Sequence, residues 1–206
     1  MIAPVSNPNA RLGAFCDGVF AIALTLLIVD IKVPAPNTIT STAELWGALR
    51  SLAPSAFAFV LSFTIILITW VNHHGALMLV HKTSGAFIYA NGFLLLTVVV
   101  LPFPTALLGA FIGTEHAAPA VVLYDAILVM QAVGWLLFGT VALRGDLLND
   151  ERAVSTVREH RRNAQGAIVL YSLLTIAALK FPVTVAIVTT VTWIFWLILS
   201  IRLKHT

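Results

Sequence analysis

Charged residues are scarce in this sequence. Twelve Lys and Arg and nine Asp and Glu make up only 10% of the 206 residues, whereas about 25% is usual for a soluble domain. Hydrophobic residues reach 59%, and the mean hydropathy is +0.96. This composition excludes a soluble globular protein, and we expect an integral membrane protein.

The small excess of positive charge does not indicate a nucleic-acid partner. The formal net charge is +3 and the pI is about 9.4. The basic residues sit between apolar runs and not along one face, as a nucleic-acid surface would require. We therefore expect a lipid bilayer around the chain and no nucleic acid.

Cysteine and catalytic motifs are also lacking. Cys16 is the only cysteine, so no intrachain disulfide can form. The sequence has no nucleophile elbow, H-E-x-x-H, P-loop or dinucleotide fingerprint, and we expect neither an enzyme nor a cofactor. His73, His74 and His81 do not predict a metal site, because adjacent histidines on a helix point about 100° apart.

Long apolar runs are what the sequence has instead. They predict an all-α integral membrane protein whose residues 1–206 form one transmembrane domain with six helices, each near or above the ~20 residues that a bilayer needs. The expected spans are approximately 14–33, 51–72, 84–112, 118–143, 164–180 and 182–202. The first ten residues have no basic n-region and no cleavage site, so we expect no signal peptide.

Two further features of the sequence stand out. Residues 144–163 are the only long charged stretch, and we expect them to form a short helix outside the membrane. Pro102 and Pro104 break backbone hydrogen bonding and should kink the third span toward its outer end.

Lys and Arg predict the orientation, because these residues favour the cytoplasmic side. With six spans, both termini share a side. That side carries nine basic residues, namely Arg11, Lys82, Arg144, Arg152, Arg158, Arg161, Arg162, Arg202 and Lys204. The other side carries Lys32, Arg50 and Lys180. We expect a multi-pass protein of the plasma membrane with both termini in the cytoplasm.

The first apolar run, Arg11–Pro34, has two distinct faces. On a wheel of roughly 100° per residue, Ile22, Leu26 and Val29 share one face, with Thr25 beside it. The opposite face is formed by Asp17, Phe20, Leu24, Leu27, Ile28 and Ile31.

Asp17 is the unusual residue of this helix. A carboxylate inside a membrane span costs about 2.5–3.5 kcal/mol on insertion scales, so it normally faces protein or water and has a partner. The alternative is a carboxylate in the first helical turn at the membrane surface.

Three stretches carry a resemblance to a known family. Arg11, Phe15, Cys16 and Asp17, followed by GVFAIALTLL, resemble the R-x-x-x-F-S-D signature of the transmembrane protein 175 family, with cysteine in place of serine. The stretch from Asn91 through L-P-F-P-T and the stretch WVNHH, at Trp70 to His74, are similar to the same family. Its members are endolysosomal potassium channels in animals, with bacterial relatives, and this chain is similar to a single-repeat bacterial-type member.

The resemblance implies a homotetramer in which the first helix lines a central pore for potassium ions. Ile22 would form the constriction, Leu26 and Val29 would form further apolar rings, and Thr25 would offer hydroxyls for ion preference. The supporting residues would be Arg11, Phe15, Cys16, Asp17, Trp70, His73 or His74, and Asn91. The filter sequence TVGYG is absent, so potassium preference must come from another feature.

Two other functions remain open from the residues alone. Asp17 and Asp125 are intramembrane carboxylates, which a proton-coupled secondary transporter would use. Transporters usually show inverted repeats and broken helices, and neither is clear here. A membrane scaffold without transport is the third interpretation.

Overall fold

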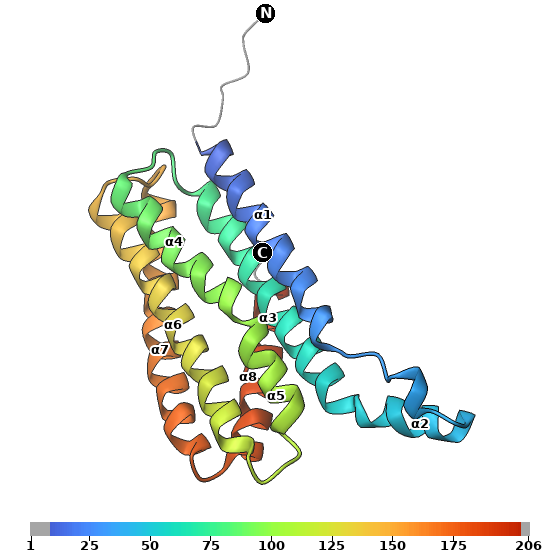
Figure 1. Ribbon diagram of the computed structural model, residues 1–206. Helices are drawn as coiled ribbons and strands as arrows, with labels where there is room; N and C mark the ends of the chain where they lie inside the picture. Colours follow the sequence, from blue (N-terminus) through green and yellow to red (C-terminus); the bar gives the residue numbers. More distant parts are fainter. Residues whose placement is uncertain (1–8, 203–206) are drawn as a thin grey trace, which may run out of the picture.

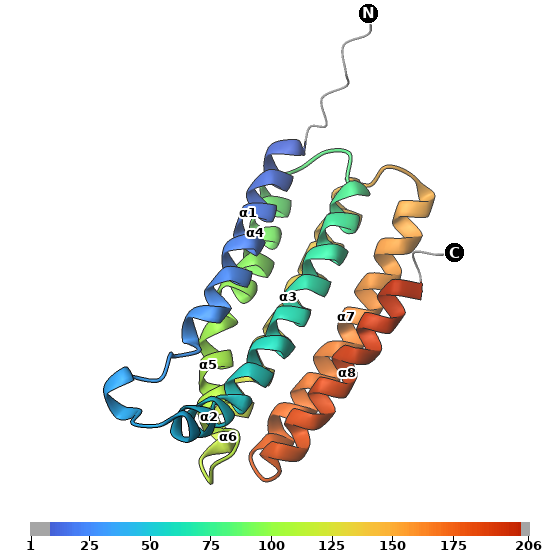
Figure 2. The ribbon, with the colours of Figure 1, turned by 90° about the vertical axis from the view of Figure 1, so that its right-hand side faces the viewer.

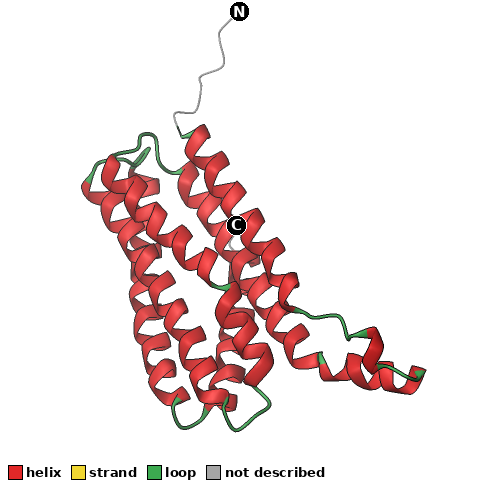
Figure 3. Cartoon of the chain, in the orientation of Figure 1, coloured by secondary structure: helices red, strands yellow, loops and turns green. Residues whose placement is uncertain are grey.

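The structure, a computed structural model, describes residues 9–202, and in the last helix the side chains of residues 195 and 197–202 lie outside this description. The described part is helical, with no strand among the elements from residue 9 to residue 202 (Figure 3). The elements are α1 (Ala10–Leu26), η1 (Leu27–Asp30), η2 (Pro36–Thr38), α2 (Thr42–Ser51), α3 (Ala53–Met78), α4 (Gly85–Val100), α5 (Pro102–Phe111), α6 (Ala117–Arg144), α7 (Glu151–Ala178) and α8 (Pro182–Arg202).

The long helices form a bundle that runs in one general direction (Figure 1). Helix α6 lies against α4, α5, α7 and α8, and its most extensive contact is with α7. Helix α1 packs on α3 and α4 at the opposite side of the bundle. The turned view places α1 with α4 on one side, α3 in the middle, and α7 with α8 on the other side (Figure 2).

Close backbone approach between helices depends on glycine. An added Cβ at Gly134 on α6 would come within 3.0 Å of the Leu94 Cα on α4. At Gly109 on α5 it would lie 2.8 Å from the Ser55 Cα on α3. Real Cβ atoms essentially never come as close as the distance at Gly109, and the distance at Gly134 is tighter than nine in ten real Cβ contacts. These glycines therefore allow the close α3–α5 and α4–α6 contacts.

Within the described residues, four segments are long and apolar enough to cross a membrane, namely Ala10–Asp30, Ala53–Met78, Gly85–Phe111 and Ala117–Arg144. A shorter apolar helix covers Pro182–Ile194. The first four predicted spans fall on these four segments.

The third predicted span is broken where its prolines lie. Helix α4 ends at Val100 and α5 begins at Pro102, with Leu101 between them. The Leu101 N–H donates to the Val98 carbonyl over 3.3 Å, a bond closer in sequence than the α-helical pattern. The Thr105 hydroxyl donates to the Leu101 carbonyl over 2.7 Å. Pro102 has no N–H to donate to the Val98 carbonyl four residues earlier, and the Leu101 N–H satisfies that carbonyl instead at the break between the two helices.

The prediction of a separate short helix within residues 144–163 is wrong. Helix α7 begins at Glu151 and runs without interruption into the apolar stretch, ending at Ala178. The Asp150 carboxylate caps it, accepting from the Ala153 N–H over 2.7 Å. Because no proline follows until the end of α7, and because Ala153 and Val157 are buried against α6, the charged stretch continues as one helix.

Helix α2 projects from the end of the bundle away from the start of α1 (Figure 1). Its first turn is a capping box, in which the Ser41 hydroxyl accepts from the Glu44 N–H over 3.2 Å. The Glu44 carboxylate accepts in turn from the Thr40 N–H over 2.6 Å. This backbone bond and one from the Thr40 hydroxyl hold the pKa of Glu44 below its usual range.

Candidate functional site

The inner face of α1 is buried and its other face is open. Phe20, Ala23 and Leu27 are each only 1% exposed, because they pack against α3 and its neighbours. On the other side, Ile22 is 61% exposed and Leu26 is 45% exposed. Val29, which lies in η1, is 60% exposed. The three residues that the sequence placed on one face are therefore all uncovered in the single chain.

One residue departs from the predicted wheel. Ile28 was placed on the inner face, yet it is 52% exposed. The physical reason is that the α-helix ends at Leu26 and continues as a 3₁₀-helix, which advances about 120° per residue. Positions after Leu26 therefore no longer follow the 3.6-residue period.

Thr25 is exposed beside this face and bonds to its own helix. Its hydroxyl donates to the Ile22 carbonyl over 2.8 Å. This is the local bond that threonine commonly forms in apolar helices. Because the proton points toward the backbone, the lone pairs of the hydroxyl oxygen remain free to face a cation.

Two hydrogen-bonded groups hold α1 against the bundle. The first joins α1 to α3, where the Trp70 indole N–H donates to the Asp17 carboxylate over 2.8 Å. The second joins three helices. The Asn91 amide on α4 donates to the Cys16 sulfur over 3.1 Å, and its oxygen lies 2.7 Å from the His73 Nε2 on α3.

The direction of these bonds follows from the chemistry of the amide. Asn91 uses its NH₂ group toward Cys16, so its oxygen must accept, and the His73 Nε2 must carry the proton. Cys16 therefore serves as an acceptor here. The weak donor capacity of a thiol, which distinguishes Cys16 from serine, does not prevent this contact.

His73 is also enclosed by rings that the sequence alone did not connect to it. The ring of Phe20 lies 5.4 Å away between centroids, and those of Phe138 and Trp135 lie 6.0 and 6.4 Å away. Trp135 and Phe138 are three residues apart and share one face of α6. The spacing of the two aromatic residues in the sequence indicates that they share a helix face. It does not indicate which histidine they contact.

Three residues of the resemblance lie outside these contacts. Arg11 is exposed, and among residues 9–202 the geometry gives no ion pair between Arg11 and Asp17. Phe15 is 62% exposed. His74 is exposed and contacts Trp70, with ring centroids 6.1 Å apart. The structure thus joins Asp17 to Trp70, and separately joins Cys16 and His73 to Asn91.

The second intramembrane carboxylate has different surroundings. Asp125 on α6 is fully buried, and its Oδ1 accepts from the Thr189 hydroxyl on α8 over 3.0 Å. Its Oδ2 has no hydrogen-bond partner among the described residues. Asp17 is held by α3 and Asp125 by α8, so the two carboxylates have no shared partner. Within the described part of the chain, no cluster of three His, Cys, Asp or Glu residues offers a metal site.

Comparison with known proteins gives consistent matches. The family model described as endosomal/lysosomal potassium channel TMEM175 matches residues 11–102, which contain α1, α3, α4 and the contacts between them. A potassium channel of Chamaesiphon minutus is 47% identical over 131 residues, which are 64% of this chain and 64% of that protein. A potassium channel of Streptomyces collinus is 37% identical over 187 residues, which are 87% of each chain.

A solved structure is also similar over nearly the whole chain. It is the crystal structure of a lysosomal potassium-selective channel TMEM175 homologue from Chamaesiphon minutus, with a TM-score of 0.83 and 34% sequence identity. The match covers 93% of this chain and 97% of that chain. The bundle described above is therefore similar to that of a solved channel.

Proposed function

Because this chain belongs to the TMEM175 family of endosomal/lysosomal potassium channels, we propose that it conducts cations and prefers potassium. The proposed pore is formed by four copies of the chain and is lined by α1. The family consists of passive ion channels, so the chain is not an enzyme. We further propose that six helices cross the plasma membrane, with both termini in the cytoplasm. The only other component that this function requires is the permeant potassium ion.

The incomplete burial of α1 is the observation that carries the proposal. In the segment Ala10–Asp30, which contains α1, only 22% of the most apolar stretch is buried. The corresponding shares for the other three candidate spans are 39%, 56% and 44%. The open face of α1 also contains Gly18 and Thr25, and a Cβ on Gly18 would meet nothing within 4 Å. Small and hydroxylated residues are typical of helix–helix interfaces in membranes. The α1 helices of further copies fit such a face.

In the proposed tetramer, each exposed apolar side chain of α1 is repeated four times around the axis. Ile22 forms the narrowest ring, and Leu26 and Val29 form two further rings toward the C-terminal end of the segment Ala10–Asp30. An apolar ring offers no ligand that replaces the hydration shell of an ion, so it blocks conduction by expelling water. The ring at Ile22 acts as the gate, and the hydroxyl oxygens of Thr25 contribute the ion preference.

The position of the gate depends on the contacts behind α1. Any displacement of α1 toward or away from the axis changes the radius of every ring that it contributes. The Trp70–Asp17 bond and the Asn91 contacts with Cys16 and His73 lie on the side of α1 away from Ile22. We infer that these residues fix α1 at one angle and do not contact the ion.

One observation favours the alternative of a proton-coupled transporter. The unpartnered Oδ2 of buried Asp125 is a place where a proton can bind. Against this, Asp17 already accepts from the Trp70 indole N–H, a contact that joins α1 to α3. The pore proposal needs neither carboxylate to release a proton.

Recording of purified protein in planar bilayers tests the function. We expect unitary current steps in potassium chloride, with a current–voltage relation that is close to linear because no arginine-rich voltage sensor is present. Flux without unitary steps would support a carrier, and absence of any flux would support a scaffold. Mass measurement of the native assembly tests the tetramer separately.

We expect Thr25→Ala to keep the current but to lower the preference for potassium over sodium. The expected reduction is roughly fivefold, equivalent to ~1 kcal/mol for one lost polar contact. The measurement is the reversal potential in mixed potassium and sodium. Thr64 on α3 is a matched control, because its hydroxyl makes the same kind of backbone bond, to the Val60 carbonyl over 2.8 Å. Equal reversal potentials for Thr25→Ala and the wild type would contradict the assignment of ion preference to Thr25.

A further inference from the structure

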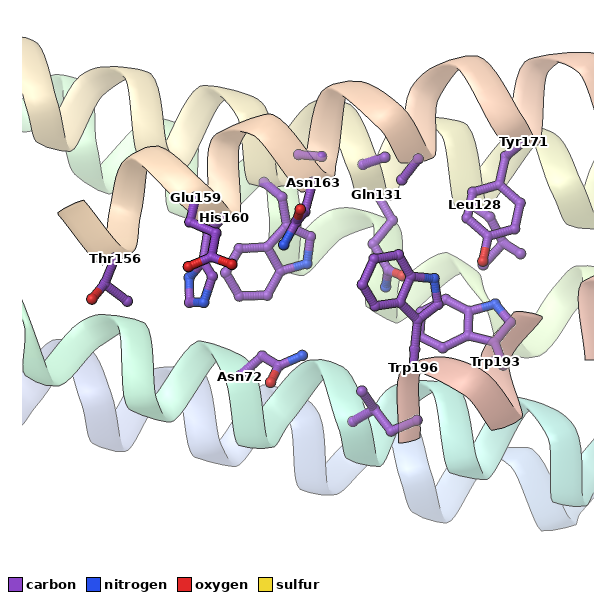
Figure 4. Close-up of a pocket in the computed structure, with 15 residues that line it drawn as sticks. Asn72, Leu128, Gln131, Thr156, Glu159, His160, Asn163, Tyr171, Trp193 and Trp196 are labelled. Atoms are coloured by element: carbon purple, nitrogen blue, oxygen red, sulfur yellow. The ribbon is translucent and has the colours of Figure 1, made fainter. Parts of the chain in front are cut away.

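A partly open cavity lies between helices of the chain, away from α1. Its volume is about 410 Å³, and its walls come from α3, α6, α7 and α8 (Figure 4). This size is within the range of small-molecule sites, roughly 300–1,000 Å³. No residue of α1 lines it, so it is separate from the proposed pore face.

The cavity has a polar end and an aromatic end (Figure 4). Thr156, Glu159, His160 and Asn163 from α7 lie at one end, and Asn72 of α3 faces them from across the cavity. The other end contains the aromatic side chains of Tyr171, Trp193 and Trp196, together with Leu128. The rings of Tyr171 and Trp193 are stacked, with an interplanar angle of 19°.

Two buried N–H groups at this cavity have no acceptor among the residues that the structure describes. Gln131 is 3% exposed, and its amide nitrogen has no hydrogen-bond partner among the described residues. Trp193 is 9% exposed, and its indole nitrogen likewise has none in the described part. Both residues line the cavity, and both unmatched groups are donors. Buried donors without acceptors are rare and unfavourable, so this end of the cavity is suited to an acceptor oxygen.

We propose that this cavity binds a small planar aromatic molecule that carries a carbonyl oxygen, a ligand site independent of the pore. The carbonyl oxygen accepts from the amide of Gln131 and lies near the indole N–H of Trp193. The ring system packs against the tryptophan side chains, which favour planar partners. A molecule with two fused rings fits the volume of the cavity.

The test compares two probes of similar shape. Coumarin has two fused rings and a lactone carbonyl, whereas naphthalene has two fused rings and no acceptor. Equilibrium dialysis of the purified protein against empty micelles of the same detergent measures the binding of each. We expect coumarin to bind wild type about fivefold to tenfold more tightly than naphthalene, the effect of one satisfied hydrogen bond.

Variants assign this difference to named donors. Gln131→Leu, which keeps the size but removes the amide, should weaken coumarin binding about fivefold to tenfold and leave naphthalene unchanged. Trp193→Phe, which keeps a ring but removes the N–H, should weaken coumarin binding by a smaller factor. Gln165→Leu is the matched control, because Gln165 is an exposed glutamine on α7 that does not line the cavity.

Two results would overturn the proposal. Equal binding of coumarin and naphthalene to the wild type would show an apolar crevice suited to lipid chains. Unchanged coumarin binding in Gln131→Leu would show that the amide is not the donor. The wild-type comparison and Trp193→Phe decide the question even where Gln131→Leu does not fold.

Discussion

Replacing Ile22 with asparagine is expected to raise the potassium current about tenfold and to admit less preferred ions. The amide group would let water remain in the narrowest ring, and a barrier lower by ~1.4 kcal/mol corresponds to a tenfold faster passage. Ile22→Phe should have the opposite effect and reduce the current, because a bulkier ring closes the pore. Both effects are measured as unitary current and as reversal potential in planar bilayers.

A matched control separates the pore from the general effect of asparagine in a span. Ile187 on α8 is 59% exposed, which is close to the 61% of Ile22, and it lies outside α1. Ile187→Asn should leave unitary current and ion preference as in the wild type. If Ile22→Asn assembles properly and conducts as the wild type does, Ile22 does not line the constriction and the pore follows another face.

Asp17→Ala is expected to reduce the yield and thermal stability of the assembled channel before it changes ion preference. The substitution leaves the Trp70 indole N–H without its acceptor, at 2.8 Å in the wild type. A partly buried donor left without an acceptor costs about 1–3 kcal/mol. The measurement is the fraction of protein that elutes as the intact assembly, together with its melting temperature.

Two further variants test the structural role of Asp17. Asp17→Asn keeps an oxygen that accepts from Trp70 and should restore much of the yield. Trp70→Phe should cost about as much as Asp17→Ala, and the double variant should add little, because both changes remove the same bond. A well-assembled Asp17→Ala channel with an altered potassium preference would instead place the carboxylate on the ion path.

Local pattern explains what the sequence predicted well. The scarcity of charge alone indicates a membrane protein, because few charged residues can be placed in a bilayer. The spacing of Ile22 and Leu26 follows the helical period, and that period determines which side chains share a face. Pro102 marks the break between α4 and α5, because proline lacks the N–H that the helix requires. These features depend only on neighbouring residues.

The contacts between distant segments were decided only by the tertiary structure. Nothing local to Cys16 states that it accepts from Asn91, 75 positions later in the chain. His73 and His74 are equivalent in the sequence, yet only His73 faces inward, because α3 is rotated so that one of two side chains about 100° apart meets α4 and α6.

Long-range packing also decided the course of α7 and the presence of the cavity. The charges of residues 144–163 suggested a separate helix, but burial of Ala153 and Val157 against α6 makes their helix continuous with the apolar half of α7. The cavity at Gln131 requires four helices to leave a space between them, which depends on packing distances and not on any one segment. The sequence by itself therefore determined that this is a membrane protein and which residues of α1 share a face. The tertiary structure determined which side chains from α3, α4 and α6 meet on the buried side of α1.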